Sequence, residues 1–178
     1  MSADPHALAD ELGFSIAEVE ARGLTLCEEA AELELAQADA DGRAHYLIPE
    51  AARAWRELKE AAAADGIGIA IASAYRSVDR QAELVRRKLA AGQSIGQALA
   101  VCAPPGFSEH HTGRAVDLAI PGMPALEAEF ASTAAFAWLV RRAAEFGFHM
   151  SYPADNPQGY LYEPWHWCYR EAEPTAFA

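Results

Sequence analysis

The apolar residues of this chain change their spacing several times, and each change marks a different predicted element. Apolar positions three and four residues apart predict helices at 5–22, 27–37, 51–64, 77–91, 94–102 and 133–147. Short apolar runs with β-branched or aromatic residues predict strands at 44–48, 67–72, 114–120, 148–152 and 160–169. The pattern therefore indicates a chain that combines helices with short strands.

Several helix ends carry signals of their own. Pro49 stands where a helix accepts proline, at its first position. Ser77 can cap the helix that follows it, because its side-chain oxygen can accept from a free backbone N–H. In the helix that begins at 133, the residues predicted to face the core are Phe136, Leu139, Val140 and Ala143.

The length and composition set limits on the organisation of the chain. It has 178 residues, of which 52% are hydrophobic, and this suits one compact main domain with its own core. We predict that residues 49–178 form this domain. Residues 1–48 are predicted to form a helical N-terminal appendage that packs on it.

The net charge of −12 excludes some classes of partner. An acidic surface repels the phosphates of nucleic acids and of anionic membranes, so neither is expected as a partner. The three cysteines form no CxxC pair, which argues against a disulfide framework. No apolar run approaches the roughly 20 residues that a membrane helix needs, so no membrane insertion is expected. The first residues show no secretory signal, and we expect a cytoplasmic protein.

The stretch 108–117, which reads SEHHTGRAVD, is the first candidate for chemistry. Gly113 can take the positive φ of a sharp turn. In the strand that follows, Asp117 lies on the face opposite to the large apolar residues, which suits a metal carboxylate. His110 and His111 compete as ligands: adjacent residues of an extended segment point in opposite directions, so only one should reach a metal. The spacing does not decide which.

A second cluster, YEPWHW at 162–167, contains Glu163 and His166. Residues three apart in a regular strand face opposite sides, so these two can serve one site only if the chain bends at Pro164. A lone histidine among tryptophans, such as His166, is more often a packed, hydrogen-bonded side chain, and a lone Asp117 would more often be a solvent-facing acid. Together the two clusters offer His, Asp and His as ligands with a free carboxylate, which is the set that a catalytic zinc site requires.

Arg76 lies between a predicted strand and the helix that Ser77 begins. A guanidinium at such a junction can bind a carboxylate through two parallel hydrogen bonds. An isolated arginine is more often part of a surface ion pair. The conjunction with the two clusters favours a role in the same site.

Three motifs in the same order resemble those of the VanY-like D-alanyl-D-alanine carboxypeptidases, a group of small zinc peptidases related to D-Ala-D-Ala dipeptidases and phage endolysins. The central motif is Ser108-x-His110-x-x-Gly113-x-Ala115-x-Asp117. The others are Ser73-Ala74-Tyr75-Arg76-Ser77-x-x-x-Gln81 upstream and Glu163-Pro164-Trp165-His166 downstream, the latter preceded by Gly159-Tyr160. The resemblance covers about 49–169.

The resemblance implies an α+β fold, with a small antiparallel sheet flanked by helices and a zinc site on the sheet. It implies that His110, Asp117 and His166 bind Zn²⁺ and that Glu163 is the catalytic base. Arg76 would bind or polarise the substrate, and Ser108, Gln81 and Tyr160 would contact it. The substrate would be a peptide derived from peptidoglycan. Which groups hold the second ring nitrogen of each histidine ligand is left open.

Two positions depart from the family pattern, and two other functions remain open. Ala74 stands where the family often has glycine, and Cys168 stands where it often has arginine. Within the fold, a peptidoglycan endopeptidase of the endolysin type is an alternative to a carboxypeptidase or dipeptidase. A non-catalytic module that binds zinc or peptidoglycan is another alternative, although such a module needs neither Glu163 nor Arg76.

Overall fold

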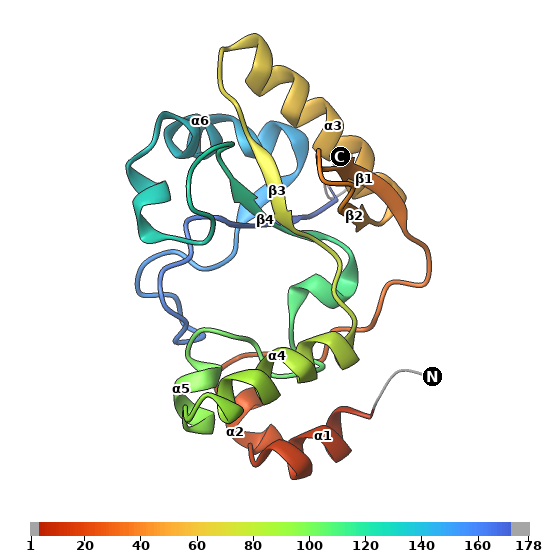
Figure 1. Ribbon diagram of the computed structural model, residues 1–178, viewed down its shortest axis with the longest axis vertical. Coiled ribbons are helices and arrows are strands. Elements are labelled where there is room, and N and C mark those ends of the chain that lie inside the picture. The colour runs from red at the N-terminus through yellow and green to blue at the C-terminus, as the bar shows by residue number, and fades with distance from the viewer. Residues whose placement is uncertain (1–3, 172–178) are drawn as a thin grey trace, which may run out of the picture.

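The structure is a computed structural model that describes residues 4–171, and it contains a four-stranded antiparallel sheet, two strands of which are labelled in the upper half of Figure 1. Its strands, in spatial order, are β3 (Ala70–Ser73), β4 (Ala115–Ala119), β6 (His166–Tyr169) and β5 (Phe148–Met150). A separate hairpin consists of β1 (Glu34–Ala38) and β2 (Ala44–Leu47). The predicted fold, a small antiparallel sheet flanked by helices, is confirmed.

The longer helices lie in two groups at opposite ends of the molecule (Figure 1). Beside the sheet, at the upper end of the figure, are α3 (Pro49–Ala64) and α6 (Ala134–Arg142). At the lower end are α1 (Pro5–Leu12), α2 (Ile16–Ala21), α4 (Val78–Ala90) and α5 (Ile95–Leu99). Three single 3-10 turns complete the described helices: η1 (Glu109–Thr112), η2 (Ala128–Ser132) and η3 (Ala143–Phe146). None of the helices within 4–171 is long and apolar enough to cross a bilayer.

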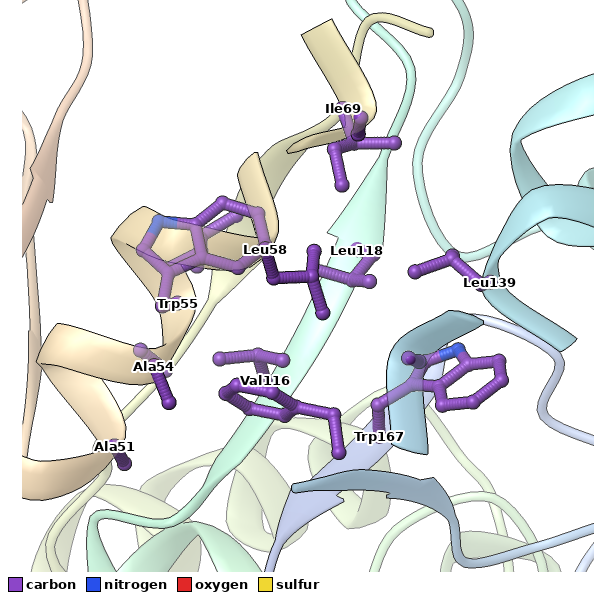
Figure 2. Close-up of a cluster of buried hydrophobic side chains, with 14 of the residues drawn as sticks. Ala51, Ala54, Trp55, Leu58, Ile69, Val116, Leu118, Leu139 and Trp167 are labelled. Atoms are coloured by element: carbon purple, nitrogen blue, oxygen red, sulfur yellow. The ribbon is translucent and has the colours of Figure 1, made fainter. Parts of the chain in front are cut away.

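The main core lies on one face of the sheet (Figure 2). Val116 and Leu118 of β4 are buried there together with Trp167 of β6. Trp55 and Leu58 of α3 and Leu139 of α6 belong to the same core and face these strand residues. Burial of each large apolar side chain contributes roughly 1.5–3 kcal/mol. This packing on one face restrains the backbones of β4 and β6. Side chains on the opposite face of these two strands are therefore held in fixed positions.

The N-terminal segment packs against the rest of the chain through two smaller clusters. Leu8 and Leu12 of α1 contact an apolar face of α4. Val19 of α2 and Leu24 pack with aromatic residues of later loops. The predicted boundary at residue 48 falls between β2 and α3, and Leu47 of β2 already belongs to the main core.

The structure corrects the helix predicted at 27–37. Residues 34–38 form strand β1, which pairs with β2. The spacing of the leucines suggested a helix, but Leu35 is largely exposed and the polar Gln37 is buried. The Gln37 side chain accepts from the backbone N–H of Ile71 at 3.2 Å and donates to the Ile71 carbonyl at 3.3 Å. Contacts with β2 and β3, distant in sequence, therefore override the local helical pattern.

Other differences are smaller. The helix predicted at 5–22 is two helices, separated at Gly13, which has a left-handed backbone. Val140, which was predicted to face the core, is 58% exposed, because α6 turns this position outward. The strand predicted at 160–169 begins only at His166, since Pro164 and the turn around it interrupt regular pairing.

Candidate metal centre and active site

Three buried side chains converge on the face of the sheet opposite the main core. His110 comes from η1, Asp117 from β4 and His166 from β6. Asp117 and His166 are direct partners in the β4–β6 register, and the turn at Gly113 returns the chain from η1 into β4. One potential ligand atom from each of the three residues lies within 4.8 Å of the others, and each residue is at most 6% exposed. The structure thus brings together the three predicted ligands.

Gly113 is required at this turn for two reasons. Its φ is +65°, a conformation that side chains resist. A Cβ at this position would also lie 3.1 Å from side-chain atoms of Ala30, Ile48 and Leu33. The close approach of the N-terminal segment and the turn geometry therefore both explain this glycine.

Each histidine of the cluster has one ring nitrogen held by an acceptor outside it. His110 Nδ1 lies 2.8 Å from the carbonyl oxygen of Ala74, which leaves Nε2 at 3.2 Å from Asp117 Oδ2. His166 Nε2 lies 2.9 Å from Glu109 Oε2, which leaves Nδ1 at 2.9 Å from Asp117 Oδ1. Such acceptors fix the tautomer and the ring orientation of metal ligands. The donor set and its orientation fit a divalent metal such as zinc.

The electrostatics of Asp117 also suit a ligand. Burial opposes its ionisation, but the charges and hydrogen bonds of His110 and His166 outweigh burial and hold the pKa of this carboxyl well below its usual range. Asp117 is therefore a carboxylate at neutral pH, ready to neutralise part of a cation's charge.

His111 is fully buried but does not join this cluster. Its Nδ1 lies 2.6 Å from the carbonyl oxygen of Arg76, and its Nε2 accepts from the backbone N–H of Gly106 at 3.1 Å. Both ring nitrogens are thus occupied by backbone groups. This geometry separates the two histidines that the sequence left as competitors: His110 faces the cluster, and His111 joins two loops.

Glu163 lies beside the cluster because the chain turns before β6 begins. The backbone N–H of His166 donates to the Glu163 carbonyl at 3.1 Å, and the N–H of Glu163 donates to the Tyr152 carbonyl at 3.1 Å. The two residues are therefore not on opposite faces of one strand. Burial raises the pKa of Glu163 to about 7, which suits a group that exchanges protons near neutral pH.

All the predicted site residues line one pocket of about 430 Å³. They are the three residues of the cluster together with Arg76, Gln81, Ser108, Tyr160 and Glu163. Within the described part of the chain, three of their buried polar atoms have no hydrogen-bond partner: Arg76 Nε, Gln81 Oε1 and Tyr160 Oη. Buried polar atoms are normally paired, so these three mark groups that a polar ligand could satisfy.

Sequence reasoning missed the residues that support the cluster. Glu109 holds His166 and also accepts from Ser151 Oγ at 2.6 Å. It sits next to His110 in the motif, but only the 3-10 turn η1 shows that its side chain reaches a residue 57 positions away. Cys168, a departure from the family pattern, is buried in β6 and does not line the pocket.

Comparisons with known proteins identify the family that the motifs resemble. Residues 44–172 match the family model described as VanY, D-alanyl-D-alanine carboxypeptidase. The D-alanyl-D-alanine carboxypeptidase of Enterococcus faecalis is 34% identical over 124 residues, which are 64% of this chain and 44% of that protein. The chain thus spans less than half the length of this relative.

Solved structures of related peptidases share the fold of this chain. The LdcB LD-carboxypeptidase superposes with a TM-score of 0.71 at 32% identity, over 79% of this chain and 69% of LdcB. VanYB, solved with D-alanine-D-alanine, gives 0.61 at 31% identity, over 82% and 81% of the two chains. A VanY structure with Zn(II) gives 0.59 at 31%, over 78% and 79%. Since the family match covers most of the chain, including His110, Asp117 and His166, the chain belongs to the VanY D-alanyl-D-alanine carboxypeptidase family.

Proposed function

We propose that this protein is a zinc-dependent peptidase that removes or releases D-alanine from D-Ala-D-Ala or from related stem peptides of peptidoglycan. The observation that carries the proposal is the convergence of three oriented ligands, a partly buried carboxylate (Glu163) and an arginine in one pocket. The relatives support it, since one is named for this activity and another was solved with D-Ala-D-Ala.

The metal would be held by His110 Nε2, an oxygen of Asp117 and His166 Nδ1. The Zn(II) complex of a VanY relative supports zinc as its identity. When bound, zinc supplies a Lewis acid and lowers the pKa of a coordinated water to about 7. The Ala74 carbonyl and Glu109 would keep the two imidazoles in the orientation that this binding needs.

The remaining steps belong to side chains of the pocket. Glu163 takes the proton of the attacking water on its carboxylate and passes it to the leaving amine. Arg76 binds an anionic oxygen of the substrate, for which its buried Nε is free among the described residues. In this assignment the pocket stabilises charge that develops as the peptide bond is attacked.

Gln81, Ser108 and Tyr160 would orient the peptide. The Gln81 amide nitrogen is committed to the Ala103 carbonyl and to Cys102 Sγ. Its Oε1 is therefore left to accept an N–H of the substrate. The Tyr160 hydroxyl can donate or accept. A small polar peptide is the ligand class that these groups fit.

A second candidate is cleavage of an L,D bond rather than a D,D bond. The observation that favours it is the TM-score of 0.71 to the LdcB LD-carboxypeptidase, which exceeds the 0.61 to VanYB. Both reactions release a terminal D-alanine, and they differ in the residue before it. The same pocket and mechanism serve either.

The test is mass spectrometry of the products after incubation of the zinc-loaded protein with three substrates. They are D-Ala-D-Ala, a pentapeptide stem that ends in D-Ala-D-Ala, and a tetrapeptide stem that ends in one D-Ala after the diamino acid. Release of D-alanine that is absent with Glu163→Ala supports the proposal and identifies the bond. If stoichiometric zinc is bound but no substrate is cleaved, an endopeptidase or a binding module replaces it.

Removal of the Glu109 carboxylate is expected to weaken metal binding without removing a ligand. In Glu109→Ala, His166 Nε2 loses its acceptor and the ring loses its fixed orientation. Loss of such a partner typically lowers metal affinity by about 10- to 100-fold. The zinc dissociation constant can be measured by competition with a chromophoric chelator. Ser151→Ala removes only a hydrogen bond to Glu109 and should have a smaller effect; equal affinity in Glu109→Ala and wild type would contradict the assignment.

A further inference from the structure

Part of the pocket wall is held by a segment that the family match does not include. The match begins at residue 44, yet Arg22, which follows α2, contacts the loop before β6. Its Nε donates to the carbonyl of Gln158 at 2.9 Å, and its guanidinium carbon lies 5.0 Å from the centre of the Tyr160 ring. Arg22 therefore joins the N-terminal segment to a residue that lines the pocket.

A line of ring contacts continues from Tyr160 to the metal cluster. The Tyr160 and Tyr152 rings meet edge to face, with centroids 4.8 Å apart. The Tyr152 ring lies against the His166 ring, again with centroids 4.8 Å apart. The Tyr152 carbonyl also accepts from the backbone N–H of Glu163. A displacement of Tyr160 would thus be transmitted to both a ligand and the proposed base.

The segment 156–163 needs such support because it contains no helix or strand. Asn156 closes its first half, since the side chain accepts from the Tyr160 N–H at 3.1 Å and donates to the Tyr160 carbonyl at 2.8 Å. Val19 and Leu24 belong to the same buried cluster as Tyr152 and Tyr160. Arg22 adds two polar contacts to this packing, since it binds the loop backbone at Gln158 and lies over the Tyr160 ring.

We propose that Arg22 is a positioning residue for the active-site pocket. It holds segment 156–163 so that Tyr160 and Glu163 keep their places beside the metal cluster. A cation over a ring and a hydrogen bond to a backbone carbonyl both restrain a loop, and both are lost together when the guanidinium is removed. The proposal rests on the proposed peptidase function for its effect on catalysis, but not for its effect on the loop.

The experiment compares three variants with the wild type. Arg22→Ala removes both contacts, and Arg22→Lys keeps a cation that can donate to Gln158 and lie over the ring. Arg86→Ala is the matched control: Arg86 binds Glu11 through two hydrogen bonds of 2.8 Å and so also joins the N-terminal segment to the rest of the chain, but away from the pocket. Amide hydrogen exchange of 156–163 is measured in the zinc-loaded proteins without substrate, followed by kcat and KM on the cleaved peptide.

In Arg22→Ala we expect exchange at 156–163 to accelerate about tenfold and kcat/KM to fall about tenfold, with the melting temperature close to that of Arg86→Ala. Arg22→Lys should recover most of both losses, and Arg86→Ala should show neither. Unchanged exchange in Arg22→Ala overturns the proposal whether or not the protein cleaves a peptide. Faster exchange with kcat/KM within twofold of wild type would show that Arg22 restrains the loop without positioning the pocket for catalysis, and this overturns the proposal that it is a positioning residue. An inactive wild type with faster exchange in Arg22→Ala would instead remove the proposed peptidase function and leave the loop restraint in place.

Discussion

Glu163→Ala is expected to lower kcat by about 10²- to 10⁴-fold while zinc stays bound. Glu163 lies in the pocket but is not one of the three residues whose ligand atoms converge. Its removal takes away the group that accepts the proton of the attacking water, while the ligands and their outer acceptors remain. Single-turnover kinetics on the cleaved peptide and zinc content by atomic absorption measure the two quantities separately.

Two further variants sharpen this result. Glu163→Gln keeps the size of the side chain and should be as inactive as Glu163→Ala. Glu127→Ala removes another carboxylate that lines the same pocket and should keep activity near that of wild type, which controls for a general loss of negative charge. Loss of zinc in Glu163→Ala would show that Glu163 is a ligand and would contradict its assignment as a base.

At a pH above about 7, the Glu163→Gln apoprotein is expected to be more stable than the wild-type apoprotein, although the substitution abolishes activity. Burial raises the pKa of Glu163 to about 7, so its ionised form is less favourable in the folded state than in the unfolded state. The wild-type apoprotein therefore loses stability as the pH rises from the unfolded pKa, about 4.3, through about 7. Above this range the neutral glutamine avoids that loss. This arrangement is typical of a site in which function opposes stability.

The sequence predicted the chemistry of the pocket better than the structure that supports it. Asp117 and His166 could be proposed as ligands because metal ligands are of a few residue types and a strand pattern places Asp117 on a known face. The choice of His110 over His111 came only from the family resemblance. The role of Glu163 was harder to place, since a regular strand would turn it away from His166. The turn at Pro164, which a proline permits but does not require, removes that conflict.

Contacts between distant segments explain what could not be predicted. Nothing in the spacing shows that Glu109 reaches His166, since the contact depends on η1 and β6 lying together. Strand β1 at 34–38 was predicted as part of a helix, because nothing in its spacing shows that the Gln37 side chain hydrogen-bonds to the backbone of Ile71 in the other sheet. Arg22 belongs to the same class: its contacts with Gln158 and Tyr160 join residues more than 130 positions apart. Periodicity reports local structure, and such contacts leave no periodic signal.

Substitutions of the adjacent residues His110 and His111 are expected to have different effects on zinc binding. His110→Ala should weaken zinc binding by roughly 10³-fold, because it removes one of three protein ligands from a site whose total binding free energy is on the order of 10 kcal/mol. His111→Ala should retain zinc, because both nitrogens of that ring are bonded to backbone groups and neither faces the cluster. Zinc affinity by chelator competition distinguishes the two.

His111→Ala should instead reduce stability. It leaves the Gly106 N–H and the Arg76 carbonyl without their partner and opens a cavity at a fully buried position. Together these effects cost about 2–4 kcal/mol, which lowers the melting temperature by about 10 °C in a chain of this size. Zinc loss in His111→Ala with zinc retained in His110→Ala would reverse the assignment. If the expected results are obtained, the two neighbouring histidines, which are similarly buried, differ in the partners of their ring nitrogens. This difference would explain why one binds the metal and the other stabilises the fold.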